Sequence, residues 1–269
     1  MIKKKSTFDS RLSLLAHYLE NFVFLRARDA LLCSFPKSGN TWLRVLYYHY
    51  LSEVFSKECE FSFRELDGRM PELGRSWLSK PWEYAPYPRV IKTHRAYSGW
   101  FRKAATRVLV VRAPEDTMVS YYAYATKLNT FVVDSSLSLF MRSSSLGLPA
   151  WMAYHEGWVP KAELVILYSE LKSDTELVLE KFLDHLGVPV DRDAVARAVE
   201  SSAFERVKKA EEKYGHTRPD EMSEGFRFAR DGSIGQGKRK LSQDDLSYLE
   251  ACWDRYDSLT GLKKMIEKA

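Results

Sequence analysis

Residues 30–50 read Ala-Leu-Leu-Cys-Ser-Phe-Pro-Lys-Ser-Gly-Asn-Thr-Trp-Leu-Arg-Val-Leu-Tyr-Tyr-His-Tyr, and this stretch decides the fold. Residues 31–33 form a short apolar run that is typical of a buried strand. Residues 36–40 then supply turn-forming Pro, Ser, Gly and Asn, and from Thr41 apolar side chains recur at helical spacing. A strand that passes through a tight turn into a helix presents backbone N–H groups at the positive end of the helix dipole. The stretch therefore predicts an anion-binding loop.

Lys37 lies inside this turn, and the hydroxyl groups of Ser38 and Thr41 add hydrogen-bond donors, which favours phosphate as the anion. Two alternatives remain open. A strand–turn–helix junction with a surface lysine is common without any ligand. The Walker A loop of nucleotide triphosphatases also joins a strand to a helix, but its G-x-x-x-x-G-K-[ST] pattern is not met, because Lys37 precedes the glycine and Ser34 stands where the first Gly belongs.

The composition is that of an ordinary globular protein, with 269 residues, 45% hydrophobic and 29% charged. The net charge of +5 suits an anionic ligand but predicts no nucleic-acid partner, which calls for a basic stripe or a known motif. Cys33, Cys59 and Cys252 are too widely spaced for a disulfide framework or a zinc knuckle. We therefore expect a reducing, cytoplasmic location.

The N-terminal segment begins like a signal peptide, but polar residues interrupt its apolar part and no cleavage site follows. We interpret residues 1–28 as carrying an amphipathic helix, packed on a single domain that spans residues 1–269. Its apolar residues on one side are Leu12, Leu15, Leu19 and Phe22. Because no apolar run approaches about 18 residues, neither a membrane span nor a membrane partner is expected.

Further apolar runs at 90–91, 108–111 and 164–167 predict strands that are buried on both faces. Helical patterns alternate with them, at residues 114–127, 176–186, 191–201, 204–213 and 243–256. This alternation predicts an α/β fold: a single three-layer domain with a central, mostly parallel sheet and helices on both faces. Residues 57–89 and 129–148 are expected to be irregular connections that shape a pocket for a small-molecule acceptor.

Polar or cationic side chains follow each of the predicted strands. Lys37 comes after the first strand, Lys92 and His94 after the second, Arg112 after the third, and Tyr168 ends the fourth. Ligands of such sheets bind beyond the carboxyl ends of the strands, so these side chains are expected to meet in one crevice.

Several segments resemble motifs of the cytosolic-type sulfotransferases, which use 3′-phosphoadenosine-5′-phosphosulfate (PAPS). Residues 35–42, Phe-Pro-Lys-Ser-Gly-Asn-Thr-Trp, resemble the family's 5′-phosphosulfate loop, Tyr-Pro-Lys-Ser-Gly-Thr-Thr-Trp. Residues 111–122 resemble its 3′-phosphate segment, Arg-Asn-Pro-x-Asp-x-x-Val-Ser-x-Tyr. Further matches follow the family's order, at residues 92–94 (Lys-Thr-His), 168–172, 202–208 and 230–232.

The resemblance implies a PAPS-dependent sulfotransferase with a P-loop-like phosphosulfate-binding loop, which releases PAP, the desulfated nucleotide. No pair of histidines has metal-ligand spacing such as H-E-x-x-H, so no metal is expected. His94 is the expected general base, and Lys37 and Lys92 are expected to stabilise the leaving 5′-phosphate. The resemblance also implies that the adenine ring stacks between Trp42 and Phe204. The residues implied to bind PAPS are Lys37, Ser38, Gly39, Asn40, Thr41, Trp42, Arg112, Ser120, Tyr168, Ser202, Phe204, Arg230, Asp231 and Gly232. For Arg112, an ion pair with Glu115 or Asp116 is the alternative.

Two departures from the family pattern matter. Asp231 replaces a lysine that would help to hold the 3′-phosphate, and the family's short dimer motif is not recognisable after Lys238, so a monomer or a weak homodimer is expected. Two other functions stay open: a P-loop nucleotide kinase or NTPase, and a non-catalytic protein that binds PAP. The missing Walker A pattern speaks against the first, and an intact His94 against the second.

Overall fold

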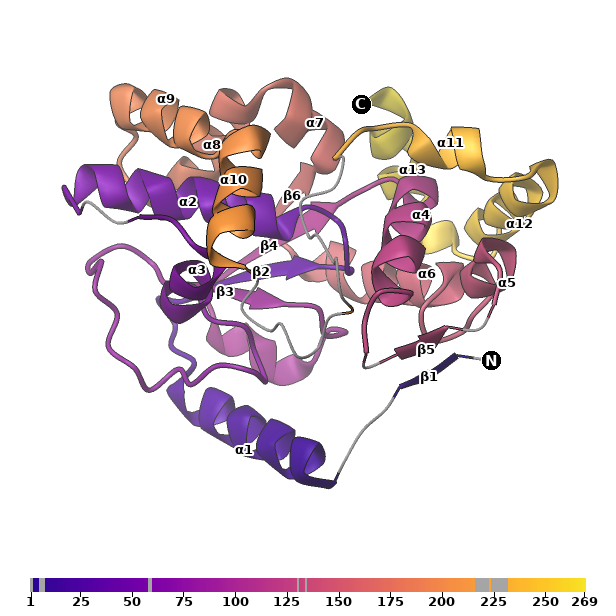
Figure 1. Ribbon diagram of the computed structural model, residues 1–269, viewed down its shortest axis with the longest axis horizontal. Helices are drawn as coiled ribbons and strands as arrows, with labels where there is room; N and C mark the ends of the chain where they lie inside the picture. Colours follow the sequence, from indigo (N-terminus) through magenta and orange to yellow (C-terminus); the bar gives the residue numbers. More distant parts are fainter. Residues whose placement is uncertain are drawn as a thin grey trace.

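A four-stranded parallel sheet forms the centre of the molecule (Figure 1). The structure is a computed structural model that describes residues 2–4, 8–57, 60–129, 131–133, 135–215, 223 and 232–269. The strand order is β3-β2-β4-β6. The bounds are Ala30–Ser34 for β2, Val90–Thr93 for β3, Thr106–Val111 for β4 and Leu164–Leu167 for β6. Because all four strands run the same way, their carboxyl ends share one edge, as the sequence predicts.

Helices cover both faces of this sheet, because alternate residues of each strand point to opposite faces and both sets are apolar. Leu31 and Leu109 belong to one buried cluster, while Leu32 and Val108 belong to a second cluster on the other face. The first cluster includes side chains of α4 (Pro114–Ala125), α6 (Leu148–Trp158), α12 (Gln243–Trp253) and α13 (Thr260–Lys268). The second includes side chains of α2 (Asn40–Val54), α8 (Thr175–His185) and α9 (Arg192–Ser201). The predicted three-layer α/β architecture is confirmed.

Several helices begin at residues whose side chains satisfy the unpaired N–H groups of the first turn. Asp174 accepts a hydrogen bond from the Leu177 N–H at the start of α8, and Ser242 and Asp245 form a capping box on α12. Pro114 opens α4, where a missing N–H costs nothing. The remaining short helices are η1 (Gly99–Lys103), η2 (Val159–Lys161), α7 (Tyr168–Ser173), α10 (Phe204–Tyr214), α11 (Gln236–Lys240) and η4 (Asp257–Leu259).

The two segments expected to be irregular contain more structure than predicted. Residues 57–89 include α3 (Phe63–Arg69), and Glu72 forms a parallel bridge with Lys92 that extends the sheet beyond β3. Residues 129–148 include β5 (Phe131–Val133), which pairs antiparallel with β1 (Ile2–Lys4), and α5 (Leu137–Met141). Pairing with a segment far away in the sequence leaves no local pattern, which is why β5 was not predicted.

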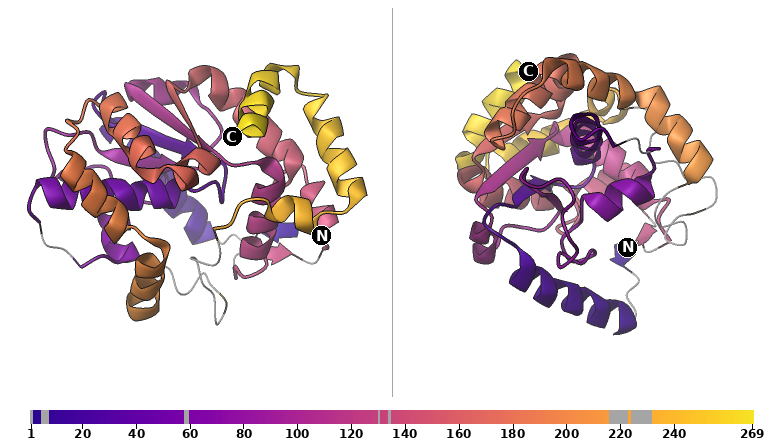
Figure 2. Two further views of the ribbon diagram at one scale, coloured as in Figure 1. Left: turned by 90° about the horizontal axis from the view of Figure 1, so that it is seen from above. Right: turned by 90° about the vertical axis from the view of Figure 1, so that its left-hand side faces the viewer.

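The N-terminal helix α1 (Phe8–Phe24) lies across the outside of the body (Figure 2). It is fixed by Asn21, which is fully buried, donates to the Ser76 carbonyl at 2.9 Å and accepts from the Gly74 N–H at 2.7 Å. The buried Leu25 adds an apolar contact just past its end. None of the helices in the described part of the chain combines the length and hydrophobicity needed to cross a membrane.

Candidate active site

The turn between β2 and α2 adopts the backbone conformation that an anion-binding loop needs. Lys37 and Gly39 both have positive φ angles, +67° and +100°. A side chain at position 39 is excluded, because an added Cβ would lie 2.4 Å from the Tyr168 ring. Gly39 is also the N-cap of the 15-residue helix α2, whose first N–H groups lack partners within the helix. These donors are therefore available to an anion, and Tyr168 forms the wall beside them.

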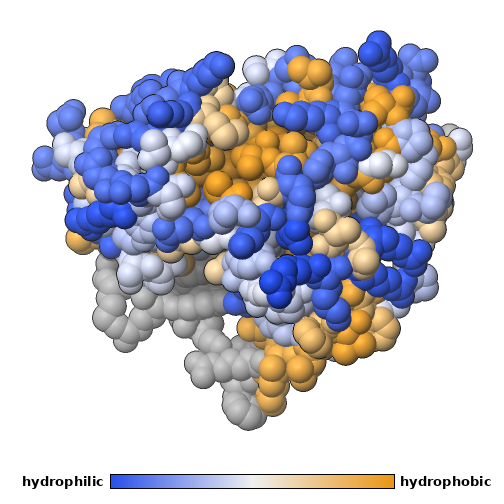
Figure 3. Space-filling view, turned by 180° about the vertical axis from the view of Figure 1, so that it is seen from behind, coloured by the Kyte–Doolittle hydropathy of each residue, from blue (hydrophilic) through white to orange (hydrophobic). Residues whose placement is uncertain are grey.

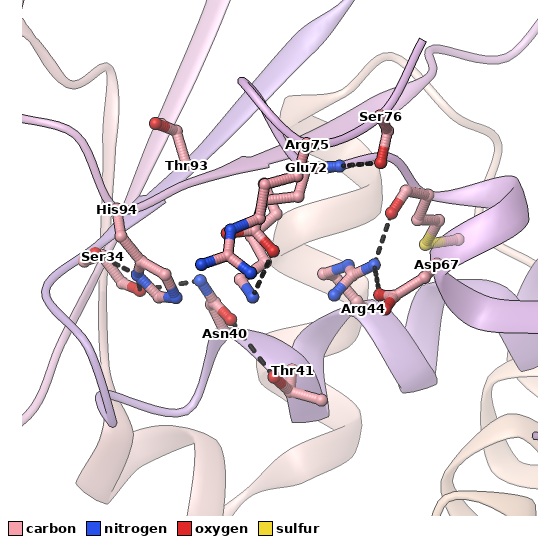
Figure 4. Close-up of polar contacts among 12 residues, drawn as sticks. Ser34, Asn40, Thr41, Arg44, Asp67, Glu72, Arg75, Ser76, Thr93 and His94 are labelled. Atoms are coloured by element: carbon pink, nitrogen blue, oxygen red, sulfur yellow. Dashed lines mark hydrogen bonds and ion pairs between the residues drawn. The ribbon is translucent and has the colours of Figure 1, made fainter. Parts of the chain in front are cut away.

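His94 lies next to this loop, just past the end of β3 (Figure 4). Its Nδ1 is 2.8 Å from the Ser34 carbonyl oxygen, which can only accept, so Nδ1 carries the proton. The other ring nitrogen, Nε2, points away from Ser34 (Figure 4) and keeps a lone pair. Asn40 donates to the Ser34 hydroxyl at 2.8 Å and so braces the same strand end. Burial and the neighbouring Lys92 lower the pKa of His94 to about 3, so the imidazole is neutral at physiological pH.

A buried carboxylate completes the surroundings of His94. Glu72 accepts a hydrogen bond and ion pair from Lys92 at 3.2 Å, and both side chains are about one-seventh exposed (14% and 15%). Burial alone would raise the pKa of Glu72. The pKa nevertheless falls to about 2, because the cations Lys92, Arg75 and Arg44 and the imidazole of His94 favour the ionised carboxylate. Figure 4 shows the Arg75 side chain between Glu72 and His94. The imidazole thus faces one ionised acid and two cations.

Arg112 follows β4 and is 7% exposed. Its Nη2 donates to the Ser233 carbonyl at 2.8 Å and lies 3.8 Å from the Asp116 carboxylate, which is the alternative ion pair expected from the sequence. Asp116 also accepts hydrogen bonds from the N–H groups of Gly235 (2.9 Å) and Gly237 (2.7 Å). Asp116 therefore fixes the late glycine-containing segment against the start of α4, and Arg112 is held between that segment and the strand end.

Tyr168 contacts both Arg112 and the late segment at Gly232. The Arg112 guanidinium lies 4.6 Å from its ring centroid, and its hydroxyl donates to the Gly232 carbonyl at 2.9 Å. On the other side of the loop, the Trp42 indole N–H donates to the Ser202 carbonyl at 3.1 Å. The residues from strand ends, loop and late segment thus meet around the start of α2, as the sequence predicts.

Three buried donors in this crevice have no hydrogen-bond partner among the described residues: the hydroxyl groups of Ser38 and Ser202 and the Nε of Arg112. Buried donors are normally paired, so an unpaired set in one crevice indicates a missing acceptor. Each comes from a different segment of the predicted nucleotide site. An anion-bearing ligand with phosphate oxygens would satisfy them, so the residues fit a nucleotide that carries more than one phosphate.

The other predicted residues take the following places. The Lys37 ammonium lies 4.6 Å from the Tyr124 ring centroid, and Thr41 donates weakly to the Asn40 side chain at 3.4 Å. Ser120 on α4 and Phe204 at the start of α10 are half-buried. Arg230 and Asp231 lie outside the described residues, so the effect of Asp231 on the 3′-phosphate site stays an open prediction.

Three residues near the site were not predicted as functional. Glu72 and Arg75 lie in a stretch that has no periodic pattern, and the only possible signal was their proximity in sequence to the aromatic loop. Asp116 was expected as a possible ion-pair partner of Arg112, whereas its carboxylate also accepts from two glycine N–H groups more than a hundred residues away. Such long-range contacts have no signature in a single sequence.

A cavity of about 230 Å³ lies on the α1 side of this centre. It is lined by the segment from Asp67 to Arg89 and by His17 of α1, and its wall includes Trp77, Trp82 and Arg75. Arg75 lines the cavity and also lies beside Glu72 and His94 (Figure 4). Residues 67–89 thus line a cavity, but His94 and the described residues between 129 and 148 are not among its lining residues, so the expected acceptor pocket stays a prediction.

A phosphate-binding loop after a parallel strand, with a neutral imidazole and a buried guanidinium beside it, defines a class of enzymes that transfer a charged group from a nucleotide. The chain matches the sulfotransferase domain over residues 27–265 and belongs to that family. It is therefore a sulfotransferase, an enzyme of the class that uses PAPS as the sulfuryl donor.

Relatives of known function share modest identity over most of the chain. Sulfotransferase 2A1 of Mus musculus is 24% identical over 242 residues, covering 83% of this chain and 82% of the relative. The 3-beta-hydroxysteroid sulfotransferase of Cavia porcellus is 23% identical over 240 residues, covering 81% and 79%. The crystal structure of mouse sulfotransferase SULT7A1 complexed with PAP superimposes with a TM-score of 0.74 at 20% identity, covering 99% of this chain and 98% of that one. These comparisons confirm the predicted family and fold.

Proposed function

We propose that this sulfotransferase moves a sulfuryl group from PAPS to a hydroxyl or amine of a small-molecule acceptor, with His94 as the general base. The observation that carries the nucleotide assignment is the set of unpaired buried donors on Ser38, Ser202 and Arg112, which come from three separate segments. We assign Ser38 to the 5′-phosphate and Arg112 to the 3′-phosphate of the ribose, an assignment supported by their positions on two separate segments. The Lys37 ammonium, on the loop itself, stabilises negative charge that develops on the leaving 5′-phosphate.

The proton transfer follows from the tautomer of His94. Because Nδ1 donates to Ser34, Nε2 is free to take the acceptor proton while the acceptor oxygen or nitrogen bonds to sulfur. The bond between that sulfur and the 5′-phosphate oxygen breaks in the same displacement, and PAP leaves. The imidazolium formed on His94 faces the ionised Glu72, which stabilises it electrostatically. Lys92 is paired with Glu72, so its contribution is to set the charge balance around His94 rather than to act alone.

The acceptor is proposed to bind in the cavity lined by residues 67–89. Trp77 and Trp82 offer flat apolar surfaces to a ring, and Arg75 stands between the cavity and His94. The steroid named for the Cavia porcellus relative is an acceptor of this ring-containing kind. Here the charged side chains Arg69, Arg75 and Glu83 also line the cavity, which suits an acceptor with both a ring and polar groups.

The test is transfer of labelled sulfate from PAPS to a panel of phenols, alcohols, amines and glycans, with product separated by chromatography. Transfer to any member supports the proposal. The alternative, a nucleotide kinase or NTPase, is favoured by magnesium-dependent ATP turnover without PAP binding. A protein that binds PAP tightly in calorimetry yet transfers sulfate to no acceptor is instead a non-catalytic PAP-binding protein.

A further inference from the structure

Helix α1 places its apolar side outward. Leu12, Leu15, Leu19, Phe22 and Val23 are 50%, 55%, 61%, 50% and 66% exposed. At 3.6 residues per turn these positions fall on one face, while Asn21 is fully buried on the opposite face. A helix that folded only to complete the core would bury its leucines, so this face is built for a contact outside the described chain. Figure 3 shows apolar residues gathered on the described part of α1 at the lower edge of the molecule.

Positive side chains border this face at the C-terminal end of the helix. Arg26 and Arg28 follow α1, and Arg102 and Lys103 lie in η1; all four are exposed. The Lys103 ammonium lies 4.4 Å from the Phe22 ring centroid, and Trp100 of η1 packs against the same ring at 5.9 Å, so η1 is continuous with the apolar face. Within the described residues, none of the four cations forms an ion pair with an acid.

No described acid offsets this charge nearby. The Glu20 carboxylate is turned to the body, where it accepts from the N–H groups of Leu78 and Ser79, and Asp29 is buried in a pair with Arg89. The surface thus combines an exposed apolar stripe with cations that form no ion pair among the described residues, although Lys103 donates to the Phe22 carbonyl. This is the arrangement of a helix that lies in the plane of a membrane interface. Basic residues beside such a stripe are attracted to anionic lipid headgroups.

We propose that α1 and η1 form a docking surface for an anionic lipid bilayer, and we call it the α1 surface (Leu12, Leu15, Leu19, Phe22, Val23, Arg26, Arg28, Arg102 and Lys103). This mode of attachment is peripheral, so the sequence expectation of no membrane partner is revised for this surface alone. Charge complementarity favours a lipid surface over a second copy of the chain, because the α1 surface as defined holds cations and no acid, whereas anionic headgroups supply the opposite charge.

The α1 surface adjoins the acceptor cavity. His17, one residue before the inward-facing Tyr18, lines the cavity and stacks on Trp77 with ring centroids 4.2 Å apart. Tyr18 reaches the loop beside Glu72, since a Cβ on Gly74 would lie 2.5 Å from its ring. Docking of α1 on a bilayer therefore holds the cavity close to the lipid headgroups, where an acceptor with an apolar part would be concentrated.

The test is co-sedimentation of the full chain with vesicles of phosphatidylcholine alone, or with about one third phosphatidylglycerol. Wild type is expected to bind the anionic vesicles, to bind the neutral ones weakly, and to dissociate as salt is raised. The double variant Leu15→Ser and Leu19→Ser is expected to lose binding by about tenfold or more, because two inserting side chains are removed. Its PAP affinity and circular dichroism are expected to match wild type, because neither side chain is buried.

A matched control is Leu177→Ser, which removes a leucine of similar exposure (59%) from α8 and is expected to leave vesicle binding unchanged. Equal binding by wild type and the double variant would overturn the proposal, as would failure of wild type to bind anionic vesicles. Light scattering tests whether a second copy of the chain, rather than a bilayer, binds the α1 surface. If wild type is a dimer that ignores vesicles and the double variant is a monomer, the α1 surface is an interface between copies.

Discussion

At the scale of single residues, the protonation state of His94 is set by the groups around it, which shift its pKa far from that of a free histidine. An imidazole that donates from Nδ1 to a carbonyl and has its pKa lowered to about 3 stays neutral from pH 8 to pH 5. We therefore expect the rate of sulfuryl transfer to show no loss on the acid side near pH 6.5, where a free histidine is protonated. A kcat profile between pH 5 and pH 8 checks this, and a fall centred near 6.5 would contradict it.

Replacement His94→Ala removes the proposed base. We expect kcat to fall by about 10²–10⁴-fold, the usual contribution of a positioned base, with PAP affinity within threefold of wild type. Steady-state transfer and calorimetric titration with PAP measure the two quantities separately. His185→Ala serves as the control, because that histidine lies on α8 and does not line the cavity. Near-normal transfer by His94→Ala would assign the base to another group.

Glu72 is proposed as a positioning residue that acts through His94 and Lys92. Glu72→Gln keeps the shape but removes the negative charge that favours the imidazolium, so kcat is expected to fall by about tenfold or more with little change in PAP affinity. Glu72→Asp should restore part of the loss. Glu65→Gln, which removes an exposed acid that lies in the same segment but does not line the cavity, is the control. If Glu72→Gln lowers the thermal midpoint but not kcat, the residue is only structural.

Arg112 is tested through nucleotide affinity. Arg112→Ala removes charge-assisted bonds to phosphate, each worth about 1.5–3 kcal/mol, which corresponds to a loss of PAP affinity of roughly 10–150-fold. Calorimetry with PAP, alongside adenosine 5′-phosphosulfate, which lacks the 3′-phosphate, identifies the phosphate that is contacted. A loss for PAP and not for the second ligand assigns Arg112 to the 3′-phosphate. Equal affinity of wild type and variant for PAP would remove Arg112 from the site.

At the scale of elements, the sequence predicts best where a local pattern and a tertiary role agree. The four strands β2, β3, β4 and β6 were predicted because parallel strands buried on both faces read as apolar runs. The positions of Lys37, His94, Arg112 and Tyr168 followed from the strands, since each lies at a strand end. The strand β5 could not be predicted, because it exists through pairing with β1, more than a hundred residues away.

The same limit explains the unpredicted side chains of the site. Glu72 is placed by a one-residue bridge to Lys92, and Asp116 by N–H groups of residues 235 and 237. Both contacts depend on where distant segments lie after folding, and neither leaves a periodicity. The orientation of α1 is a further case: its amphipathic pattern was visible, but the pattern does not say that the buried face carries Asn21 and the exposed face carries the leucines.

Helix α6 offers a test of stability against pH. His155 is fully buried against Trp151, with ring centroids 3.8 Å apart, and burial lowers its pKa to about 3. The unfolded chain binds a proton near pH 6.5 and the folded chain does not, so stability is lost as pH falls from 6.5 toward 3. For this group the loss between pH 7 and pH 5 is about 2 kcal/mol. Urea unfolding of wild type and His155→Gln should show a smaller pH dependence in the variant.

At the scale of the whole molecule, a buried ion pair ties the N-terminal helix, the cavity segment and the sheet together. Arg89, just before β3, pairs with Asp29 at 2.8 Å, and their side chains are 6% and 3% exposed. Its guanidinium also donates to the carbonyl groups of Leu78 (2.6 Å) and Phe24 (3.4 Å). One side chain thus joins the end of α1 to the wall of the cavity.

Breaking this pair should destabilise the entire fold. Arg89→Ala leaves the Asp29 carboxylate buried without its partner, so the free energy of unfolding is expected to fall by about 3–5 kcal/mol. Arg197→Ala breaks the exposed pair with Glu53 (54% and 34% exposed) and should cost less than about 1 kcal/mol. Urea unfolding followed by circular dichroism compares the two. Because Arg89 fixes α1 as well as the cavity segment, Arg89→Ala should also lose vesicle binding at urea concentrations below its global unfolding. Equal free energies of unfolding for Arg89→Ala and Arg197→Ala would contradict the prediction and show that α1 is held by its other contacts.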